Sequence, residues 1–212
     1  APEIRGVKVD FCSLAALEVK GDADPVVDGI HVVRTDGSGL YLHERSQGTY
    51  MEVHLEDTTL CGIEAKGEVE ADLEAFHLYS GRAGGIWVRE QARVEALDCN
   101  IRRQGGIAVE VRDQGQLLLE SSIIKNNMDT AFQASGNSTA RLKDCEWMDN
   151  SGDGLVLMGA ARCRIEGGRS HPSQGLALRL GGTSRMTHTN FAWVGEVEIS
   201  PGAQLVEAEA DA

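Results

Sequence analysis

The stretch from Gly85 to Val111, GIWVREQARVEALDCNIRRQGGIAVEV, contains one full copy of a motif and the start of the next. Each copy opens with a small residue, followed by an apolar residue, a variable residue and a second apolar residue. The same opening recurs along almost the whole chain, at Ala16, Gly39, Gly62, Gly85, Gly106, Ala131, Gly154 and Gly175. These openings lie 21 to 25 residues apart, and most often 23. A period in this range is typical of proteins built from stacked repeats.

Within each repeat the apolar residues fall into fixed columns, and inside each short segment they alternate with a period of two, which indicates strands. Each repeat contains three such segments, and between them the apolar positions change from odd-numbered to even-numbered residues or back. This pattern predicts a three-sided coil. Successive coils would stack at the strand spacing of about 4.8 Å, so that like residues form ladders. The sequence therefore predicts an all-β fold, a right-handed parallel β-helix of eight to nine coils with about 23 residues per coil. The right hand is expected because crossover connections between parallel strands are overwhelmingly right-handed.

The column assignment is least regular in the repeat that opens at Gly106. Leu117 is placed there in the column of Ala96. Ser121 and Ile123 reach the columns of Cys99 and Ile101 only if this repeat contains a one-residue insertion. In the following repeats, Met186 is placed with Ile165 and Phe191 with Ser170.

Other repeat architectures fit less well. Leucine-rich repeats share the period but need a different spacing of Leu and Asn. Ankyrin and tetratricopeptide repeats are longer and helical, and the sequence has no helical periodicity beyond a turn or two. The unbroken repeat also favours one domain over residues 1–212, with coils over 2–199 and an acidic cap or frayed tail over 200–212.

The start of the chain matches the middle of a coil. Ile4, Val7 and Val9 occupy the columns of Val27, Ile30 and Val32. We therefore expect the chain to be part of a larger protein, with a neighbouring domain beside its first coil.

Composition excludes some partners. The formal net charge is −13, which disfavours broad binding to nucleic acid because like charges repel. No stretch approaches the roughly 20 apolar residues of a membrane span. No motif calls for a cofactor.

The cysteines indicate the redox compartment in which the protein resides. There are five, an odd number, and no pair has metal-site spacing. Cys99 and Cys145 would point inward two coils apart, about 9.6 Å, which is too far for a disulfide. Together with the absence of a signal peptide at the start, this favours a reducing, cytoplasmic location, although a leader removed from the mature chain would leave the same sequence.

The stretch Gly85 to Val111 resembles the repeats of right-handed parallel β-helix proteins of the pectin-lyase-like group, and it is most similar to the β-helix repeats of F-box substrate adaptors. Asn126-Asn127 and Asp149-Asn150 match the Asn-containing turn of such repeats. The resemblance covers roughly residues 2 to 193. The group includes polysaccharide lyases, hydrolases, epimerases, tailspikes and non-catalytic interaction modules, so the fold does not decide the activity. Neither a DPHD-like epimerase motif nor a set of aligned aspartates of the glycoside-hydrolase kind is found.

The first candidate site lies on outward positions of the opening strands. One column is basic, and the neighbouring column alternates carboxylates with aromatic residues. Exposed aromatics stack on sugar rings or anchor protein partners, and cations hold carboxylates. In related β-helix enzymes the substrate groove runs along such a face. The candidate ligand-binding residues are Tyr41, His43, Glu64, Lys66, Trp87 and Arg89, with Glu18, Lys20 and Arg45 beside them. The alternative is an ordinary solvated strand face with alternating charges.

The second candidate is a histidine ladder, His31, His54 and His77, whose members lie one repeat apart and are followed by Asn100. Neutral imidazoles about 5 Å apart are potential metal ligands, so the ladder is a weak candidate metal site. Simple stacking of like side chains is the favoured interpretation, because a flat outward ladder lacks an enclosing shell.

Two functions follow from these residues. The first is a non-catalytic recognition module that binds a protein segment or an oligosaccharide on the face that carries Trp87. The second is a polysaccharide-active enzyme, either a lyase with Arg89 or Lys66 as its base or a glycosidase using Glu18 and Glu64. A purely structural spacer is a third possibility.

Overall fold

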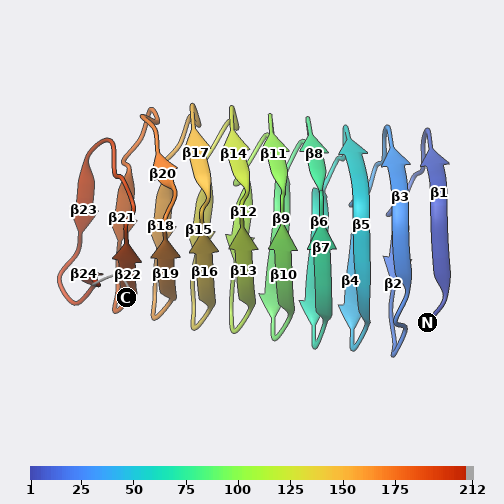
Figure 1. Cartoon of the computed structure of the whole chain (residues 1–212), viewed down its shortest axis with the longest axis horizontal. Helices are drawn as coiled ribbons and strands as arrows, with labels where there is room; N and C mark the ends of the chain where they lie inside the picture. Colours follow the sequence, from blue (N-terminus) through green and yellow to red (C-terminus); the bar gives the residue numbers. More distant parts are fainter. Residues whose placement is uncertain (209–212) are drawn as a thin grey trace.

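The chain folds as a stack of parallel strands along one long axis, in a computed structural model that describes residues 1–208 (Figure 1). The regular secondary structure of these residues consists of strands alone. The strands form one sheet of nine and one sheet of 15. Each coil contributes one strand to the nine-stranded sheet, which gives nine turns and confirms the predicted parallel solenoid. Among these residues, no helix has the length and apolarity of a membrane span.

Each coil has three sides. The first side is the nine-stranded sheet, with β2 (Leu17–Val19), β4 (Leu40–Glu44), β6 (Cys61–Gly67), β9 (Gly84–Glu90), β12 (Val109–Val111), β15 (Phe132–Ala134), β18 (Leu155–Leu157), β21 (Leu178–Leu180) and β23 (Val197–Ile199). The second side contains β7 (Glu70–Glu74), β10 (Arg93–Leu97), β13 (Gln116–Glu120), β16 (Thr139–Lys143), β19 (Arg162–Glu166), β22 (Arg185–Thr189) and β24 (Gln204–Glu207).

The third side contains β8 (His77–Tyr79), β11 (Asn100–Arg102), β14 (Ile123–Lys125), β17 (Glu146–Met148) and β20 (Arg169–Ser170). Three long strands run through the second and third sides and join them into the 15-stranded sheet; they are β1 (Glu3–Val9), β3 (Val26–Val32) and β5 (Gln47–Glu56). In the segment expected to be a cap or tail, β24 extends the second side; residues 209–212 lie outside the described residues.

The register is uniform through the coils around Gly106. Ile86 pairs with Val109, and Val109 pairs with Phe132, so these coils have the same length. The openings predicted at Gly106 and Gly175 are therefore wrong by two residues, and Ala108 and Ala177 take their places. The error arises because a shift of two residues keeps the side chains on the same face of a strand, so the apolar alternation looks the same in both registers.

The same shift explains the apparent insertion. Leu119, not Leu117, pairs with Ala96, and Ile124, not Ile123, pairs with Ile101. No extra residue is needed, and Ser122, not Ser121, lies beside Cys99, whose backbone N–H donates to the Ser122 hydroxyl at 3.0 Å. Near the end of the chain, Met186 pairs with Cys163 instead of Ile165. The bridge between Arg169 and Ala192 places Phe191 two residues before the position opposite Ser170.

The corners of the coil are marked by single residues with positive φ. Between the second and third sides φ is 51° at Glu52, 56° at Ala75 and 58° at Asp98, which occupy the same position in three successive coils. The other two corners repeat the pattern at Glu44, Glu90 and Asp113, and at Asp57, Ser80 and Arg103. The chain thus turns at the same three points in successive coils, although few of these residues belong to types that favour the left-handed region.

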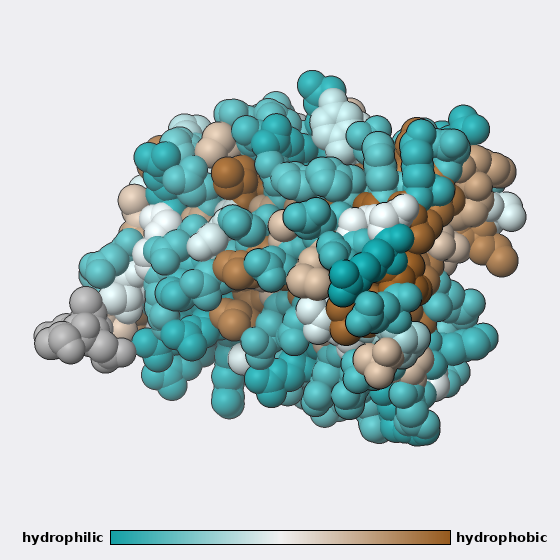
Figure 2. All heavy atoms as spheres, turned by 45° about the vertical axis from the view of Figure 1, so that its right-hand side comes forward, coloured by the Kyte–Doolittle hydropathy of each residue, from teal (hydrophilic) through white to brown (hydrophobic). Residues whose placement is uncertain are grey.

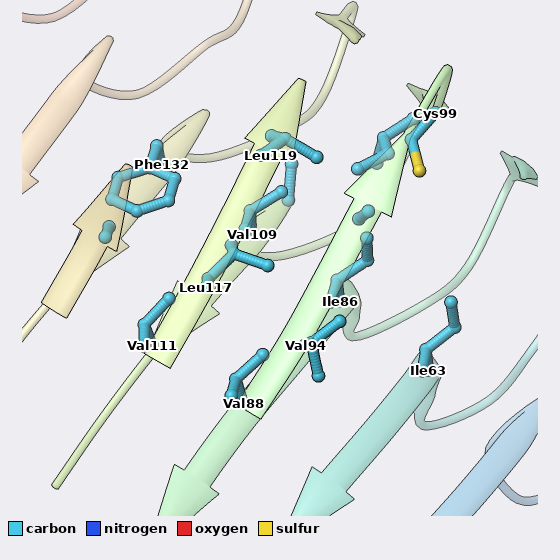
Figure 3. Packing of buried hydrophobic residues seen from close by; sticks show 14 of the residues in the cluster. Ile63, Ile86, Val88, Val94, Cys99, Val109, Val111, Leu117, Leu119 and Phe132 are labelled. Carbon is cyan, nitrogen blue, oxygen red and sulfur yellow. The ribbon is translucent and has the colours of Figure 1, made fainter. Parts of the chain in front are cut away.

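The interior is filled with apolar ladders. Val32, Leu55, Leu78 and Ile101 have at most 1% of their surface exposed and lie on successive paired strands. Figure 3 shows the equivalent ladder of the first side, where Ile63, Ile86, Val109 and Phe132 point into the core from neighbouring strands. The core is continuous along the stack, so each coil is stabilised mainly by its two neighbours.

Cys99 and Cys145 occupy the inward columns predicted for them. Cys99, Cys145 and Cys163 are buried, and all five cysteines are free thiols. Burial raises the pKa of Cys99 to about 12 and that of Cys145 to about 11, so both thiols are inert near neutral pH. Cys61 begins β6 and is also buried, with its sulfur 3.4 Å from the Ser38 hydroxyl.

The first coil lies at one end of the solenoid. β1 pairs with β3 in the predicted columns, Ile4 beside Val27 and Val7 beside Ile30. Apolar residues are exposed at this end, among them Phe11 and Leu14, and Figure 2 shows the apolar surface gathered there.

Candidate functional site

The predicted ligand-binding residues lie together on the outer surface of the first side. Tyr41, Glu64 and Trp87 pair across β4, β6 and β9. His43, Lys66 and Arg89 form the parallel row beside them. Their neighbours along the strands, such as Leu42 and Ile63, are fully buried, and this alternation directs the six side chains outward. We call these six residues the aromatic–basic face.

Cations cover the aromatic rings of this face. The guanidinium carbon of Arg89 lies 4.2 Å from the centre of the Trp87 ring. The ammonium of Lys66 lies 5.9 Å from the centre of the Tyr41 ring, and the pKa of Lys66 is raised chiefly by its hydrogen bond with Tyr41. On its own strand, Tyr41 stacks on His43 with ring centres 4.4 Å apart. These are cation–π geometries that hold both charges in place.

Two carboxylates flank Arg89. Its guanidinium is 3.8 Å from Glu64 and 3.8 Å from Glu110. Glu110 has only 2% of its side chain exposed, and Arg112 forms a second ion pair with it. A buried carboxylate is costly unless it is paired, so Arg89 and Arg112 offset the burial of Glu110.

Sequence reasoning missed Glu110 and Arg112. Glu110 on β12 pairs with Trp87, and Arg112, which follows β12, lies 23 residues after Arg89, so the two residues continue the rows of the face into the next coil. The two-residue error at Gly106 assigned Ala108 to the row of Trp87 and hid this extension. A strictly constant period counted from Trp87 is the signal that would have found Glu110.

The indole ring of Trp87 is packed at its edge as well as on its flat surface. The indole is partly buried, and its Nε1 is enclosed with no hydrogen-bond partner among the described residues. A Cβ on Gly84 would lie 2.6 Å from this nitrogen, so the ring occupies space that only glycine leaves open. The indole is therefore fixed before any ligand arrives.

At the other end of the face, Glu18 continues the row of Tyr41 on β2. His43 Nε2 lies 2.9 Å from Glu18 Oε1, and Lys20 lies 3.7 Å from the same oxygen. The hydrogen bond with His43, followed by the charge of Lys20, lowers the pKa of Glu18 below 4.5.

We expect this shift to depend on His43. In the His43→Ala protein, the pKa of Glu18 should rise towards 4.5, because the largest cause of its depression is removed. A lowered pKa means that the interaction is present above the unfolded-state value and is lost as the pH falls through the folded value. An NMR titration of the side-chain carboxyl carbon measures this. Glu166, whose pKa is lowered by Arg141, should titrate alike in both proteins; an unchanged Glu18 curve would contradict the assignment.

The histidine ladder forms on the outer surface of the third side. His31 pairs with His54, and His54 with His77 and then Asn100. The ring centres of His54 and His77 are 4.5 Å apart with planes 16° from parallel, while His31 meets His54 at 6.0 Å. Burial, followed by the nearby His54, lowers the pKa of His77. Within residues 1–208 no group of three or more His, Cys, Asp or Glu side chains is arranged to hold a metal ion, and the ladder stacks instead of converging on a point.

A family model described as the right-handed β-helix region matches residues 84–192, which are 109 of the 212 residues. The chain belongs to the right-handed β-helix family. This membership bears out the sequence resemblance and the expected hand of the coil. It concerns the β-helix repeat itself, so the likeness to F-box substrate adaptors stays a prediction. No curated protein matches the chain significantly.

Proposed function

We propose that this β-helix protein is a non-catalytic recognition module that binds a protein segment or a glycan on the aromatic–basic face. The observation that carries the proposal is the stacking of Arg89 on Trp87, 4.2 Å from the ring centre. The stacked guanidinium is fixed in orientation and still has 28% of its side chain exposed. A cation held in this way loses little freedom when it binds a carboxylate.

The chemistry of the face favours a ligand with acidic groups. Arg89 and Lys66 are neighbours in one row, on strands about 4.8 Å apart. The guanidinium forms paired hydrogen bonds with carboxylates, and the ammonium adds a second positive charge. An acidic protein segment and a uronate-containing glycan both present carboxylates in this way.

The alternative is a polysaccharide-active lyase, hydrolase or epimerase. A lysine that acts as a general base needs a lowered pKa, whereas the pKa of Lys66 is raised. The general acid of a glycosidase pair needs a raised pKa, whereas the pKa of Glu18 is lowered, so Glu18 does not suit that one role. The raised pKa of Lys66 supports binding over a lyase reaction in which Lys66 is the base.

Arrays of acidic peptides and of glycans, probed with wild-type and Trp87→Ala proteins, test the proposal. We expect Trp87→Ala to weaken binding by about tenfold or more, because truncating an aromatic anchor typically costs at least 1–2 kcal/mol. Tyr79→Ala is the matched control, because Tyr79 is also an exposed ring under an arginine, Arg103, on the third side. Equal binding by Trp87→Ala and wild type would rule out this face.

A screen for new reducing ends and for unsaturated products by ultraviolet absorbance addresses the alternative. If the wild-type protein forms product and Arg89→Ala or Glu64→Ala does not, the protein is an enzyme and the binding-module proposal is wrong.

A further inference from the structure

The outer surface of the second side changes charge along the solenoid. Its first strands carry Glu70, Asp72 and Glu74 on β7 and Glu95 on β10. Its last strands, from β16 to β22, carry Arg141, Arg162, Arg164 and Arg185. A hollow of about 650 Å³ lies over this basic end, and none of its lining residues is a carboxylate. This is unusual in a chain with 33 acidic and 20 basic residues, and it points to an anionic ligand.

Two of these arginines have no compensating charge among the described residues. Arg162 on β19 pairs in register with Arg185 on β22, which places like charges side by side on neighbouring strands. Such a pair is destabilising unless an anion lies between the two charges. Arg141 and Arg164 both contact Glu166. Within residues 1–208, in contrast, neither Arg162 nor Arg185 forms an ion pair or a side-chain hydrogen bond.

The neighbours of this pair in the same row are neutral but can donate hydrogen bonds. Thr139 lies beside Arg162, and Gln204 lies beside Arg185. Thr187 adds a partly buried hydroxyl to the hollow. The floor is formed by Ala140 and Cys163, which are buried and uncharged. The hollow therefore offers two guanidinium groups and several neutral donors.

We propose that the Arg162–Arg185 hollow binds a compact tetrahedral oxyanion, the phosphate or sulfate monoester group of a small ligand. Two guanidinium groups on strands about 4.8 Å apart are able to contact different oxygen atoms of one tetrahedral anion, each with paired N–H donors. Binding removes the repulsion between the two arginines. The site lies on the second side and is independent of the aromatic–basic face.

The charge gradient limits the size of the ligand. In the two rows that contain Arg162 and Arg164, the nearest carboxylates towards the start of the chain are Glu95 on β10 and then Asp72 and Glu70 on β7. β10 lies three strand spacings from β19, a distance of about 14 Å. An extended polyanion lying along this side would be repelled by these carboxylates. The hollow thus selects a short or terminal anionic group over a long nucleic acid.

Titrations with inorganic phosphate and with sulfate at low ionic strength, followed through arginine Nε–H signals in NMR spectra, test the site. We expect each anion to perturb Arg162 and Arg185, and chloride at equal ionic strength to leave them unchanged. Arg162→Gln and Arg185→Gln should each weaken binding at least fivefold. Arg93→Gln is the matched control, because Arg93 belongs to the same row, at the acidic end, and should change the affinity less than twofold.

The pH dependence separates the two anions. Inorganic phosphate should bind more tightly as the pH rises through its second pKa, near neutrality, where it becomes a dianion, whereas the binding of sulfate should not change. Absence of any perturbation by either anion would overturn the proposal, and so would an equal loss of affinity in Arg93→Gln. Binding of a 20-base-pair DNA duplex more tightly than phosphate would overturn the size limit. Circular dichroism confirms that the exposed Arg→Gln variants keep the fold.

Discussion

Replacing Trp147 with alanine is expected to lower the free energy of unfolding by about 3–5 kcal/mol. Trp147 on β17 is the largest fully buried side chain of the described residues, and its ring stacks on Phe191 with centres 4.8 Å apart. Its removal would leave a cavity between coils whose spacing is set by backbone pairing with β14 and β20. Because the strands are held in register, the core has little freedom to collapse into this cavity.

Two further tryptophan variants make the prediction specific. Trp147 Nε1 is buried with no hydrogen-bond partner within residues 1–208, so Trp147→Phe removes an unsatisfied donor and keeps most of the ring. We expect Trp147→Phe to cost no more than about 1.5 kcal/mol. Trp87→Ala makes the same change as Trp147→Ala on the partly exposed outer face and should cost less than half as much.

Chemical denaturation followed by circular dichroism measures these differences, through the midpoint and slope of each unfolding curve. A loss below about 1 kcal/mol in Trp147→Ala would contradict a tightly packed interior at this coil. An equal loss in Trp147→Phe would show that the indole N–H is not the unsatisfied group that the packing indicates.

The sequence carried enough information for the fold because a solenoid repeats one environment many times. Val32, Leu55, Leu78 and Ile101 share a column since each packs on the one before it, and the pattern survives individual deviations. The register was harder to predict. A shift of two residues leaves the apolar alternation intact, so Ile107 was wrongly assigned to an inward position of the next strand.

The positions of the corners could not be predicted from the local sequence. Ala75 and Glu52 adopt positive φ, although their side chains disfavour this region. Pairing on both sides fixes these residues, so the long-range ladder overrides the local preference. A glycine or asparagine would have marked the turn in the sequence, but in many coils neither is present.

The candidate site was predicted in position but not in detail. The constant length of the first repeats was enough to bring Tyr41, Glu64 and Trp87 onto one face. It could not show that Arg89 stacks on Trp87, because that contact depends on side-chain conformations set by Glu64 and Glu110.

A second large effect is expected at Asn127, in the Asn-containing turn on which the sequence resemblance partly rests. Asn127 and Asn150 are each 1% exposed and lie one above the other in successive coils. Asn127 Oδ1 accepts the backbone N–H of Gln104 at 2.9 Å. Asn127 Nδ2 donates to Asn150 Oδ1 at 2.8 Å and to the Ile101 carbonyl at 3.4 Å. The side chain thus joins three coils inside the stack.

Asn127→Leu should lower the free energy of unfolding by roughly 2–5 kcal/mol, because the buried Gln104 N–H loses its acceptor and the Ile101 carbonyl loses a donor. Asn137→Leu, an exposed asparagine in a neighbouring turn, should change it by no more than about 0.5 kcal/mol. The double variant Asn127→Leu/Asn150→Leu should cost less than the sum of the single changes, since the hydrogen bond between the two amides can be lost only once. Additive losses measured by chemical denaturation would mean that the two amides act independently, and a loss below about 1 kcal/mol in Asn127→Leu would mean that water satisfies the groups left behind.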